Sequence, residues 1–394
     1  MIDELKSFHE FGTETICSET RCAALNLAVP TFTNEFWTAK QRAAHSLHEI
    51  SYRACFKPQL PRFFIERLTR PGDIVYDPFM GRGTTPVEAA LMGRVPYGCD
   101  VNPLCAMLTR PRLSLPDSAQ IEKRLAGLDL QYSGELPQDL LVFYHPDTLR
   151  ELCALRRYFA RPKLSPADQW LRMVAVNRLT GHSAGFFSVY TLPPNQAVSV
   201  ESQRKINAKR DQVPEYRDVK KLILRKSRSL LKDCAESFPY YIGDPLVLSH
   251  TNENTPEIAS GSVALIVTSP PFLDVVDYKQ DNWLRNWFVS IDPEALEITI
   301  EHTPEGWKTA MTRVFRELYR VLRPGGSLAF EVGEIRHGSL RMEELVLPAG
   351  AEAGLKPELI LINEQEFTKT AHCWGVDNHT KGTNSNRIVL FRKE

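Results

Sequence analysis

The chain has 394 residues, which is long enough for one large domain with an insertion or for two domains. It is 43% hydrophobic and 24% charged, so a sizeable core can form, and its formal net charge of zero excludes an argument for a polyanionic partner from overall charge alone. Eight cysteines without a C-x-x-C pair favour reduced thiols over a disulfide framework or a zinc site.

The N-terminal sequence MIDELKSFHEFG lacks the basic and apolar regions of a signal peptide, and no apolar run approaches the length of a membrane span. We therefore expect a cytoplasmic protein without membrane contact. No His, Cys and Asp set has metal-ligand spacing, so we expect no metal.

The first 70 residues contain two helix predictions. Residues 1–33 show no interpretable pattern, whereas 36–48 can form a helix with Asn34 as its N-cap. Lys57-Pro58 precedes an amphipathic helix at 63–68. On its own, Lys57 is most simply a solvated lysine before a proline turn.

A strand, a glycine turn, a helix and a second strand follow one another over residues 74–100. The first strand, 74–76, ends at Asp77, and the turn contains Gly81 and Gly83. The helix continues to about residue 92, and the second strand, 95–99, ends at Asp100. Glycines let the backbone approach a ligand closely, free N–H groups at a helix start can bind an anion, and an acid after the second strand can bind ribose hydroxyls.

The motif Asp77-Pro78-Phe79-Met80-Gly81-Arg82-Gly83-Thr84-Thr85 resembles the S-adenosylmethionine site of DNA methyltransferases that act on exocyclic amines. The string from Gly98 to Pro103 resembles the second motif of that site, and Lys57-Pro58 resembles its remaining motif. The resemblance implies a Rossmann-like, doubly wound class I methyltransferase sheet of the α/β class with S-adenosyl-L-methionine as cofactor. The cofactor-binding residues that it implies are Lys57, Asp77, Pro78, Phe79, Gly81, Gly83, Thr84, Thr85, Asp100, Asn102 and, after a short strand at 240–243, Asp244.

The regular alternation of strands and helices stops after Pro103, and helical periodicity dominates the middle of the chain. Residues 149–159 and 167–179 predict helices, and 180–196 predict an aromatic, polar loop or short hairpin. We expect this mainly helical insertion to read a nucleic-acid target. Its first polar candidates are His182, Tyr190, Asn195 and Gln196.

The segment 201–232 is strongly basic. The segment contains eleven Lys and Arg residues, between Arg204 and Lys232, and four acidic residues, so it carries a formal charge of +7 and the rest of the chain carries −7. Such asymmetry suits a phosphate backbone, and we expect nucleic-acid contact here. The alternative is a solvated helical face.

A buried parallel strand is predicted at 263–267, followed directly by Ser269-Pro270-Pro271-Phe272. Ser269 and the Pro270 carbonyl can accept the N–H bonds of an exocyclic amine and so direct its lone pair toward a methyl donor. Consecutive prolines fix the backbone, and Phe272 can stack on an extruded base. Asp277 and Tyr278 are further candidates for lining this pocket.

The C-terminal region predicts a helix at 309–322, a Pro-Gly-Gly turn and a strand at 327–332. Strands at 358–363 and 387–392 would complete the sheet. We therefore divide the chain into a first catalytic segment (34–115, cofactor motifs), an inserted target-recognition region (116–238) and a second catalytic segment (239–394, S-P-P-F motif).

The resemblance implies methyl transfer from S-adenosylmethionine to N4 of a flipped cytosine in double-stranded DNA, because serine in this motif is typical of N4-cytosine enzymes. It also implies a place in, or descent from, a restriction-modification system, with a cognate restriction endonuclease as partner and association with the prokaryotic nucleoid when bound. The alternatives are adenine N6 in DNA, an exocyclic amine in RNA, and a non-catalytic nucleic-acid-binding protein on the same fold.

Overall fold

The computed structural model describes the chain except for residues 39–43, 54, 193–196, 235–237, 239–242, 272–277, 297–300, 302, 333, 336–339 and 365–384. At residues 278, 279, 334, 335, 340 and 385 it describes only the backbone. No helix among the described residues is long and apolar enough to cross a membrane.

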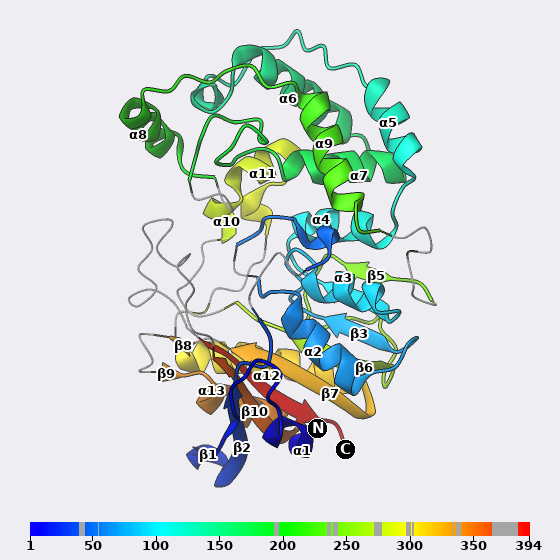
Figure 1. Ribbon diagram of the computed structural model, residues 1–394, viewed down its shortest axis with the longest axis vertical. Coiled ribbons are helices and arrows are strands. Elements are labelled where there is room, and N and C mark those ends of the chain that lie inside the picture. The colour runs from blue at the N-terminus through cyan, green and yellow to red at the C-terminus, as the bar shows by residue number, and fades with distance from the viewer. Residues whose placement is uncertain are drawn as a thin grey trace.

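The molecule is built around a nine-stranded mixed sheet with the order β1-β2-β10-β11-β7-β6-β3-β4-β5 (Figure 1). The strands are β1 (Ile16–Cys22), β2 (Leu27–Asn34), β3 (Ile74–Asp77), β4 (Val95–Cys99), β5 (Leu246–Leu248), β6 (Val263–Thr268), β7 (Leu322–Val332), β10 (Lys356–Glu364) and β11 (Ser385–Arg392). A separate small pair joins β8 (Glu334–Ile335) and β9 (Leu340–Arg341).

Strands β5, β4, β3, β6 and β7 are parallel, and β11 lies antiparallel between β7 and β10. From β3 the chain adds β4 and β5 on one side, then returns to add β6 and β7 on the other. The point between β3 and β6 is therefore a topological switch point, where ligands bind at the carboxyl ends of the strands. This order, with the reversed β11, confirms the predicted doubly wound methyltransferase sheet.

Residues 1–33, whose sequence shows no interpretable pattern, contribute two strands to the sheet. The β1–β2 hairpin adds to it through parallel pairing of β2 with β10. Asn34 ends β2 instead of capping a helix, and the backbone N–H groups of Phe36 and Trp37 donate to Asn363 Oδ1 at 2.7 and 3.1 Å. In the described part of 36–48 the only helical turn is the 3₁₀ turn η3 (Ser46–His48), so the predicted helix is wrong there.

Helices cover both faces of the sheet, since alternate strand residues are buried on opposite sides. Val75 and Leu265 pack with α2 (Gln59–Leu68), whereas Tyr76 and Ile266 pack with α12 (Pro304–Val321). The helices and 3₁₀ turn that flank the sheet are α1 (Ile2–Lys6), η1 (Ala23–Leu25), α2 (Gln59–Leu68), α3 (Thr84–Leu91), α4 (Pro103–Leu113), α12 (Pro304–Val321) and α13 (Glu343–Glu352). The 3₁₀ turn η5 (Pro293–Ala295) precedes α12.

The remaining helices form a second layer that lies at the end of the sheet in Figure 1. They are α5 (Ser118–Ala126), η4 (Gln138–Val142), α6 (Pro146–Phe159), α7 (Pro166–Val176), α8 (Val200–Arg210), α9 (Val219–Leu231), α10 (Tyr278–Asp281) and α11 (Trp283–Val289). The mainly helical insertion is thereby confirmed.

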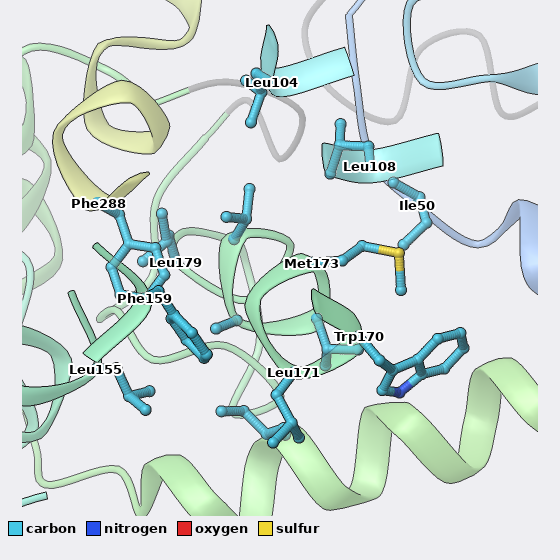
Figure 2. Packing of buried hydrophobic residues seen from close by; sticks show 14 of the residues in the cluster. Ile50, Leu104, Leu108, Leu155, Phe159, Trp170, Leu171, Met173, Leu179 and Phe288 are labelled. Atoms are coloured by element: carbon cyan, nitrogen blue, oxygen red, sulfur yellow. The ribbon is translucent and has the colours of Figure 1, made fainter. Parts of the chain in front are cut away.

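The insertion shares its core with the rest of the chain. In Figure 2, Trp170 and Met173 of α7 lie with Leu108 of α4 and Phe288 of α11 in one buried cluster. The indole N–H of Trp170 donates to Ser227 Oγ of α9 at 3.0 Å. The helical layer is thus packed on α4, the helix that directly follows Asp100 and Asn102.

Candidate functional site

The glycine turn after β3 has the backbone geometry that its sequence predicts. Gly81 and Gly83 have positive φ angles of 50° and 76°. A Cβ on Gly83 would lie 2.3 Å from Thr109 Oγ1, and one on Gly98 would lie 2.6 Å from Met80 Sδ. Thus Gly83 is required both for its left-handed conformation and for its close packing against α4.

Asp77 is buried at the carboxyl end of β3, under the turn. Its Oδ1 accepts a hydrogen bond from Thr268 Oγ1 at 2.6 Å and one from the Phe79 N–H at 3.1 Å. Burial raises the pKa of Asp77 to about 7, against the lowering effect of hydrogen bonds from Thr268, Phe79 and Thr85 and with a further raising effect of Asp100. No described cation forms an ion pair with this carboxylate, so it would gain from a positively charged ligand.

Asp100, at the end of β4, joins the turn to the start of α4. Its Oδ2 accepts from the Gly81 N–H at 3.0 Å, and its Oδ1 accepts from the Asn102 N–H at 2.9 Å. Burial raises the pKa of Asp100. Asn102 caps α4 through Leu104 N–H, and its buried Nδ2 has no acceptor among the described residues. The carboxylate keeps free lone pairs for ligand hydroxyls, and Nδ2 keeps a free donor.

Two buried arginines, which the sequence analysis did not predict as site residues, form hydrogen bonds around the glycine turn. Arg82 donates to the Ile50 carbonyl at 2.7 Å and to Thr84 Oγ1 at 3.2 Å. Arg112 of α4 donates to the carbonyls of Leu47, at 3.0 Å, and of Arg82. Burial and the charge of Arg82 lower the pKa of Arg112 to about 9. Only the three-dimensional structure shows that the Arg112 side chain binds the backbone carbonyl of Arg82, 30 residues earlier in the chain.

Lys57 lies near the turn, in the loop before α2. Burial, and then the charge of Arg82, lower the pKa of its ammonium group. Thr84 and Thr85 are buried in the first turn of α3, where Thr85 Oγ1 donates to the Val267 carbonyl of β6 at 3.1 Å. The structure therefore brings Lys57, both threonines and the two acidic strand ends to one place.

Asp244 is a correction. It is exposed and precedes β5, whereas the sequence placed it after a strand. The neighbouring Gly243 lies against Val95, the first residue of β4, so Asp244 is at the amino end of the sheet, opposite Asp100. The predicted strand at 240–243 lies outside the described residues except for Gly243. The strand that pairs with β4 is Leu246–Leu248, which follows Asp244 in the chain.

Asn252 is the polar residue that the structure brings to the carboxyl end of β5. It is buried, and its Nδ2 donates to the Pro78 carbonyl of the glycine turn at 2.8 Å. The sequence signal that could have indicated it is the polar stretch directly after Leu246–Leu248.

Ser269-Pro270-Pro271 follows β6 directly and lies beside β7. The Ser269 side chain is hydrogen-bonded to Glu331 of β7, whose carboxylate also accepts from Asn386 of β11. Burial raises the pKa of Glu331 to about 7, although both hydrogen bonds lower it. The Pro271 carbonyl accepts from the indole N–H of Trp307 at 3.0 Å, and no described residue donates to the Pro270 carbonyl. Phe272 and Asp277 lie outside the described residues, as does the Tyr278 side chain.

The candidates for target reading are divided between described and undescribed residues. His182 is exposed and lies beside Phe186, and the Arg210 guanidinium stacks 3.8 Å from the centroid of the Tyr190 ring. Asn195 and Gln196 lie outside the described residues. Residues 180–196, predicted to be a loop or a short hairpin, form a loop in their described part, with one isolated parallel bridge between Gly181 and Tyr190.

Six of the eleven cations of the basic segment form ion pairs within the described chain. They are Arg204, Lys205, Arg217, Lys226, Arg228 and Lys232. Lys220 instead donates to the carbonyls of Ala126 and Leu128 at the end of α5. In contrast, exposed Lys209 and Lys221 have no such partner in the described ranges. Much of the segment's charge is therefore already paired within the described chain.

The model of the N6/N4 DNA methylase family matches residues 27–108, from β2 to α4. This segment, about a fifth of the chain, is thus similar to the DNA methylase family. Type II methyltransferase M.MjaII of Methanocaldococcus jannaschii is 37% identical over 90 residues, covering 23% of this chain and 17% of the relative. Type II methyltransferase M.MvaI of Kocuria varians is 32% identical over 111 residues, covering 27% and 23%. The chain thus spans about a fifth of the length of these curated relatives.

Two solved structures similar to the chain are TrmN of Thermus thermophilus and a SAM-dependent methyltransferase of Methanosarcina mazei. The TM-scores are 0.34 and 0.35, at 12% and 11% identity, with 89% and 84% of this chain and 52% and 96% of the other covered. Because these TM-scores are low, we assign the fold from the strand order alone.

S-adenosylmethionine is the cofactor that the family match supports, and the residues of the site fit it. The ligand carries a sulfonium and an ammonium group, which suit two buried carboxylates without an ion-pair partner among the described residues. Its ribose suits Asp100, and the free donor of Asn102 suits a ligand acceptor. Asp77 and Asp100 would hold these groups beside the glycine turn.

Proposed function

We propose that this protein transfers a methyl group from S-adenosylmethionine to an exocyclic amine of DNA, with N4 of cytosine as the target. One contact carries the proposal. Thr268, the residue before Ser269, donates to Asp77 of the cofactor motif at 2.6 Å. The motif that would hold the methyl donor follows β3, and the motif that would hold the amine follows β6. Because β3 and β6 are adjacent and parallel, the two motifs lie side by side at the same edge of the sheet.

The described residues divide the work of orienting the amine. Bound S-adenosylmethionine supplies a methyl group on a good leaving group. When the Ser269 hydroxyl donates to Glu331, its oxygen lone pairs can accept one N–H of the amine, and the Pro270 carbonyl can accept the other. The indole N–H of Trp307 donates to the Pro271 carbonyl and so fixes the peptide group that follows the one carrying the Pro270 carbonyl. Positioning of this kind contributes much of the rate enhancement of such transfers.

The product amine must lose a proton after transfer. Glu331, with its pKa near 7 and its hydrogen bond to Ser269, can take this proton through the serine hydroxyl. A carboxylate with a pKa near 7 is suited to this role, because at neutral pH a large fraction is ionised and can accept the proton, and the proton can then be released to water.

We propose cytosine because the Ser269-Pro270-Pro271-Phe272 motif resembles that of DNA amino-methyltransferases. In that family, serine at the first position of the motif is typical of N4-cytosine enzymes. We further propose that DNA is bound with its target base flipped, that the helical insertion reads the recognition sequence, and that exposed cations such as Lys209 contact phosphates. The type II designation of the relatives supports a role in restriction-modification with a cognate endonuclease.

Substitution of Ser269 tests the assignment. Ser269→Ala should lower the single-turnover rate of methyl transfer to DNA about 100-fold or more, because one acceptor and the proton path are lost, while cofactor affinity stays within about twofold. The matched control is Ser262→Ala, which removes a half-buried serine directly before β6, at the end opposite Ser269, and should leave the rate unchanged.

A wild-type rate retained in Ser269→Ala would remove this serine from the reaction. Glu331→Gln adds a second readout. The wild-type rate should rise with pH to a plateau above about pH 7 as Glu331 ionises, whereas the variant should be slower and lack this limb.

A further inference from the structure

Tyr190 and Arg210 come together at the surface of the helical insertion. Tyr190 lies in the aromatic loop that follows α7, and Arg210 is the last residue of α8. The central carbon of the Arg210 guanidinium lies 3.8 Å from the centroid of the half-buried Tyr190 ring. A guanidinium over an aromatic face is attracted by the ring quadrupole and loses part of its conformational freedom. The exposed side chain of Arg210 is therefore oriented before any ligand binds.

Three amide side chains fix the position of Tyr190. Its carbonyl accepts hydrogen bonds from Gln203 Nε2 of α8 at 3.1 Å and from Gln212 Nε2 at 2.9 Å. Both of these amides also donate to Asn207 Oδ1, at 2.7 and 2.8 Å. Since these contacts already attach α8 to the loop, the Arg210 side chain is not needed to hold the two together.

The segment that leads into α8 is attached to the helices that follow the S-P-P-F motif. The indole N–H of Trp283, at the start of α11, donates to the carbonyls of Ala197 and Val198 at 3.3 Å each. Helix α8 begins shortly after them, at Val200. The helix that carries Arg210 is thus anchored to the second catalytic segment, which suits an element that positions DNA for the proposed transfer.

The guanidinium of Arg210 keeps its hydrogen-bond donors available. Within the described chain its contact is with the Tyr190 ring, and no described Asp or Glu forms an ion pair with it. Arg161 provides a contrast, because its guanidinium lies 4.3 Å from the centroid of the Tyr158 ring, whose hydroxyl donates to Asp168 at 2.9 Å. A carboxylate therefore already lies beside the ring of Arg161, whereas Arg210 has its donors free for a ligand.

The residue after Arg210 favours a base edge over a phosphate as this ligand. Asp211, the C-cap of α8, is exposed and forms no ion pair among the described residues. Its carboxylate would repel a phosphate, whereas base edges in the major groove present donors as well as acceptors, such as the N4 amine of cytosine. Guanine O6 and N7 are the pair of acceptors that matches two N–H donors of an arginine.

We propose that Arg210 reads a guanine of the DNA recognition sequence through O6 and N7 in the major groove, with Tyr190 as the platform that orients it. This inference rests on the proposed function, in which the insertion reads DNA, and it assigns a residue and a base to that role. Arg210 thereby differs from its neighbour Lys209, whose contact with phosphates is independent of sequence.

The test is the selection of bound duplexes from a DNA pool with a randomised central segment, followed by sequencing. The full-length wild type should enrich a sequence with guanine at a fixed position. Arg210→Lys keeps the charge and loses the two parallel donors, so its discrimination at that position should fall about tenfold or more while the other positions stay unchanged.

Two further variants examine the platform and the specificity of the effect. Tyr190→Phe keeps the aromatic ring and should select the wild-type sequence, whereas Tyr190→Ala should weaken the preference at the guanine position alone. The matched control is Arg161→Lys, an exposed arginine that also lies over a tyrosine ring and should select the wild-type sequence.

Three results would overturn the proposal. The first is an Arg210→Lys protein with the full guanine preference, because charge alone would then suffice. The second is a uniform loss of affinity for all sequences, with a smaller salt slope, which would assign Arg210 to phosphates. The third is a wild type that enriches no sequence. Because selection requires no methyl transfer, failure of the proposed chemistry is recognised separately through Ser269→Ala.

Discussion

The carboxyl edge of the sheet and the helical insertion use charge in opposite ways. At the edge, Asp77, Asp100 and Glu331 are withdrawn from water without a described cationic partner, and burial raises the pKa of each. In the insertion, most of the basic segment is paired with acids or helix ends, as in the contact of Lys226 with Glu49 at 3.0 Å. Most positive charges of the basic segment are therefore already paired within the described chain, whereas the buried acids of the sheet edge have no described cation and remain available to a ligand.

The glycine turn gives the largest expected effect. Gly83→Ala should destabilise the protein by about 2–5 kcal/mol and abolish cofactor binding, because it adds a Cβ at φ 76° and within 2.3 Å of Thr109 Oγ1. Gly72→Ala is the matched control, since Gly72 has φ 85° but nothing within 4 Å of an added Cβ. It should cost about 1–2 kcal/mol. Denaturant unfolding and cofactor titration measure both, and equal losses would contradict the close-packing argument.

Asp77→Asn tests whether the buried carboxylate is held ready for a ligand. The pKa of Asp77 is about 7 in the folded protein and near 3.8 when unfolded, so the folded state binds more protons between these values. Without cofactor, wild-type stability should therefore fall as pH rises from about 4 to about 7, and Asp77→Asn should reduce this fall.

The control for this pH experiment is Asp139→Asn, an exposed acid of the insertion, which should keep the wild-type profile. Thermal melts across the pH range measure the effect. A profile of Asp77→Asn that superimposes on the wild type would show that Asp77 titrates normally.

The smallest effects should separate the two kinds of lysine in the insertion. Lys209→Ala, at an exposed residue without a described partner, should weaken DNA binding a few-fold and reduce the salt slope by about 0.9. Lys226→Ala should instead cost about 1 kcal/mol of stability through the lost contact with Glu49 and leave the salt slope unchanged. Reversed outcomes would place the DNA contact on α9.

The sequence predicted those regions of the fold in which local chemistry dictates local structure. The glycines, the acids after β3 and β4, and the strand before Ser269 follow from backbone geometry and periodicity, and they lie where expected. The position of Asp244 relative to a strand was predicted wrongly, because β5 has only three residues and gives little periodicity. From the sequence, Asp244 before this strand was as plausible a ligand as the polar residues after it.

Other features depend on distant pairing and could not be predicted from sequence. Glu331 meets Ser269 only because β7 lies beside β6, and Arg112 meets the Arg82 carbonyl only because α4 folds back over the turn. The β1–β2 hairpin joins the sheet through β10, more than 300 residues away along the chain. Such contacts are set by tertiary structure, and a charge count along the sequence gives no indication of which charges they neutralise.

The most direct test of methyl transfer is to incubate the purified protein with labelled S-adenosylmethionine and unmethylated genomic DNA, followed by nucleoside mass spectrometry. Wild type should produce labelled N4-methylcytosine, and Ser269→Ala should produce about 100-fold less. Labelled N6-methyladenine would keep the site and contradict the choice of base. Absence of label from DNA and from RNA, with cofactor binding intact, would contradict the proposed activity itself.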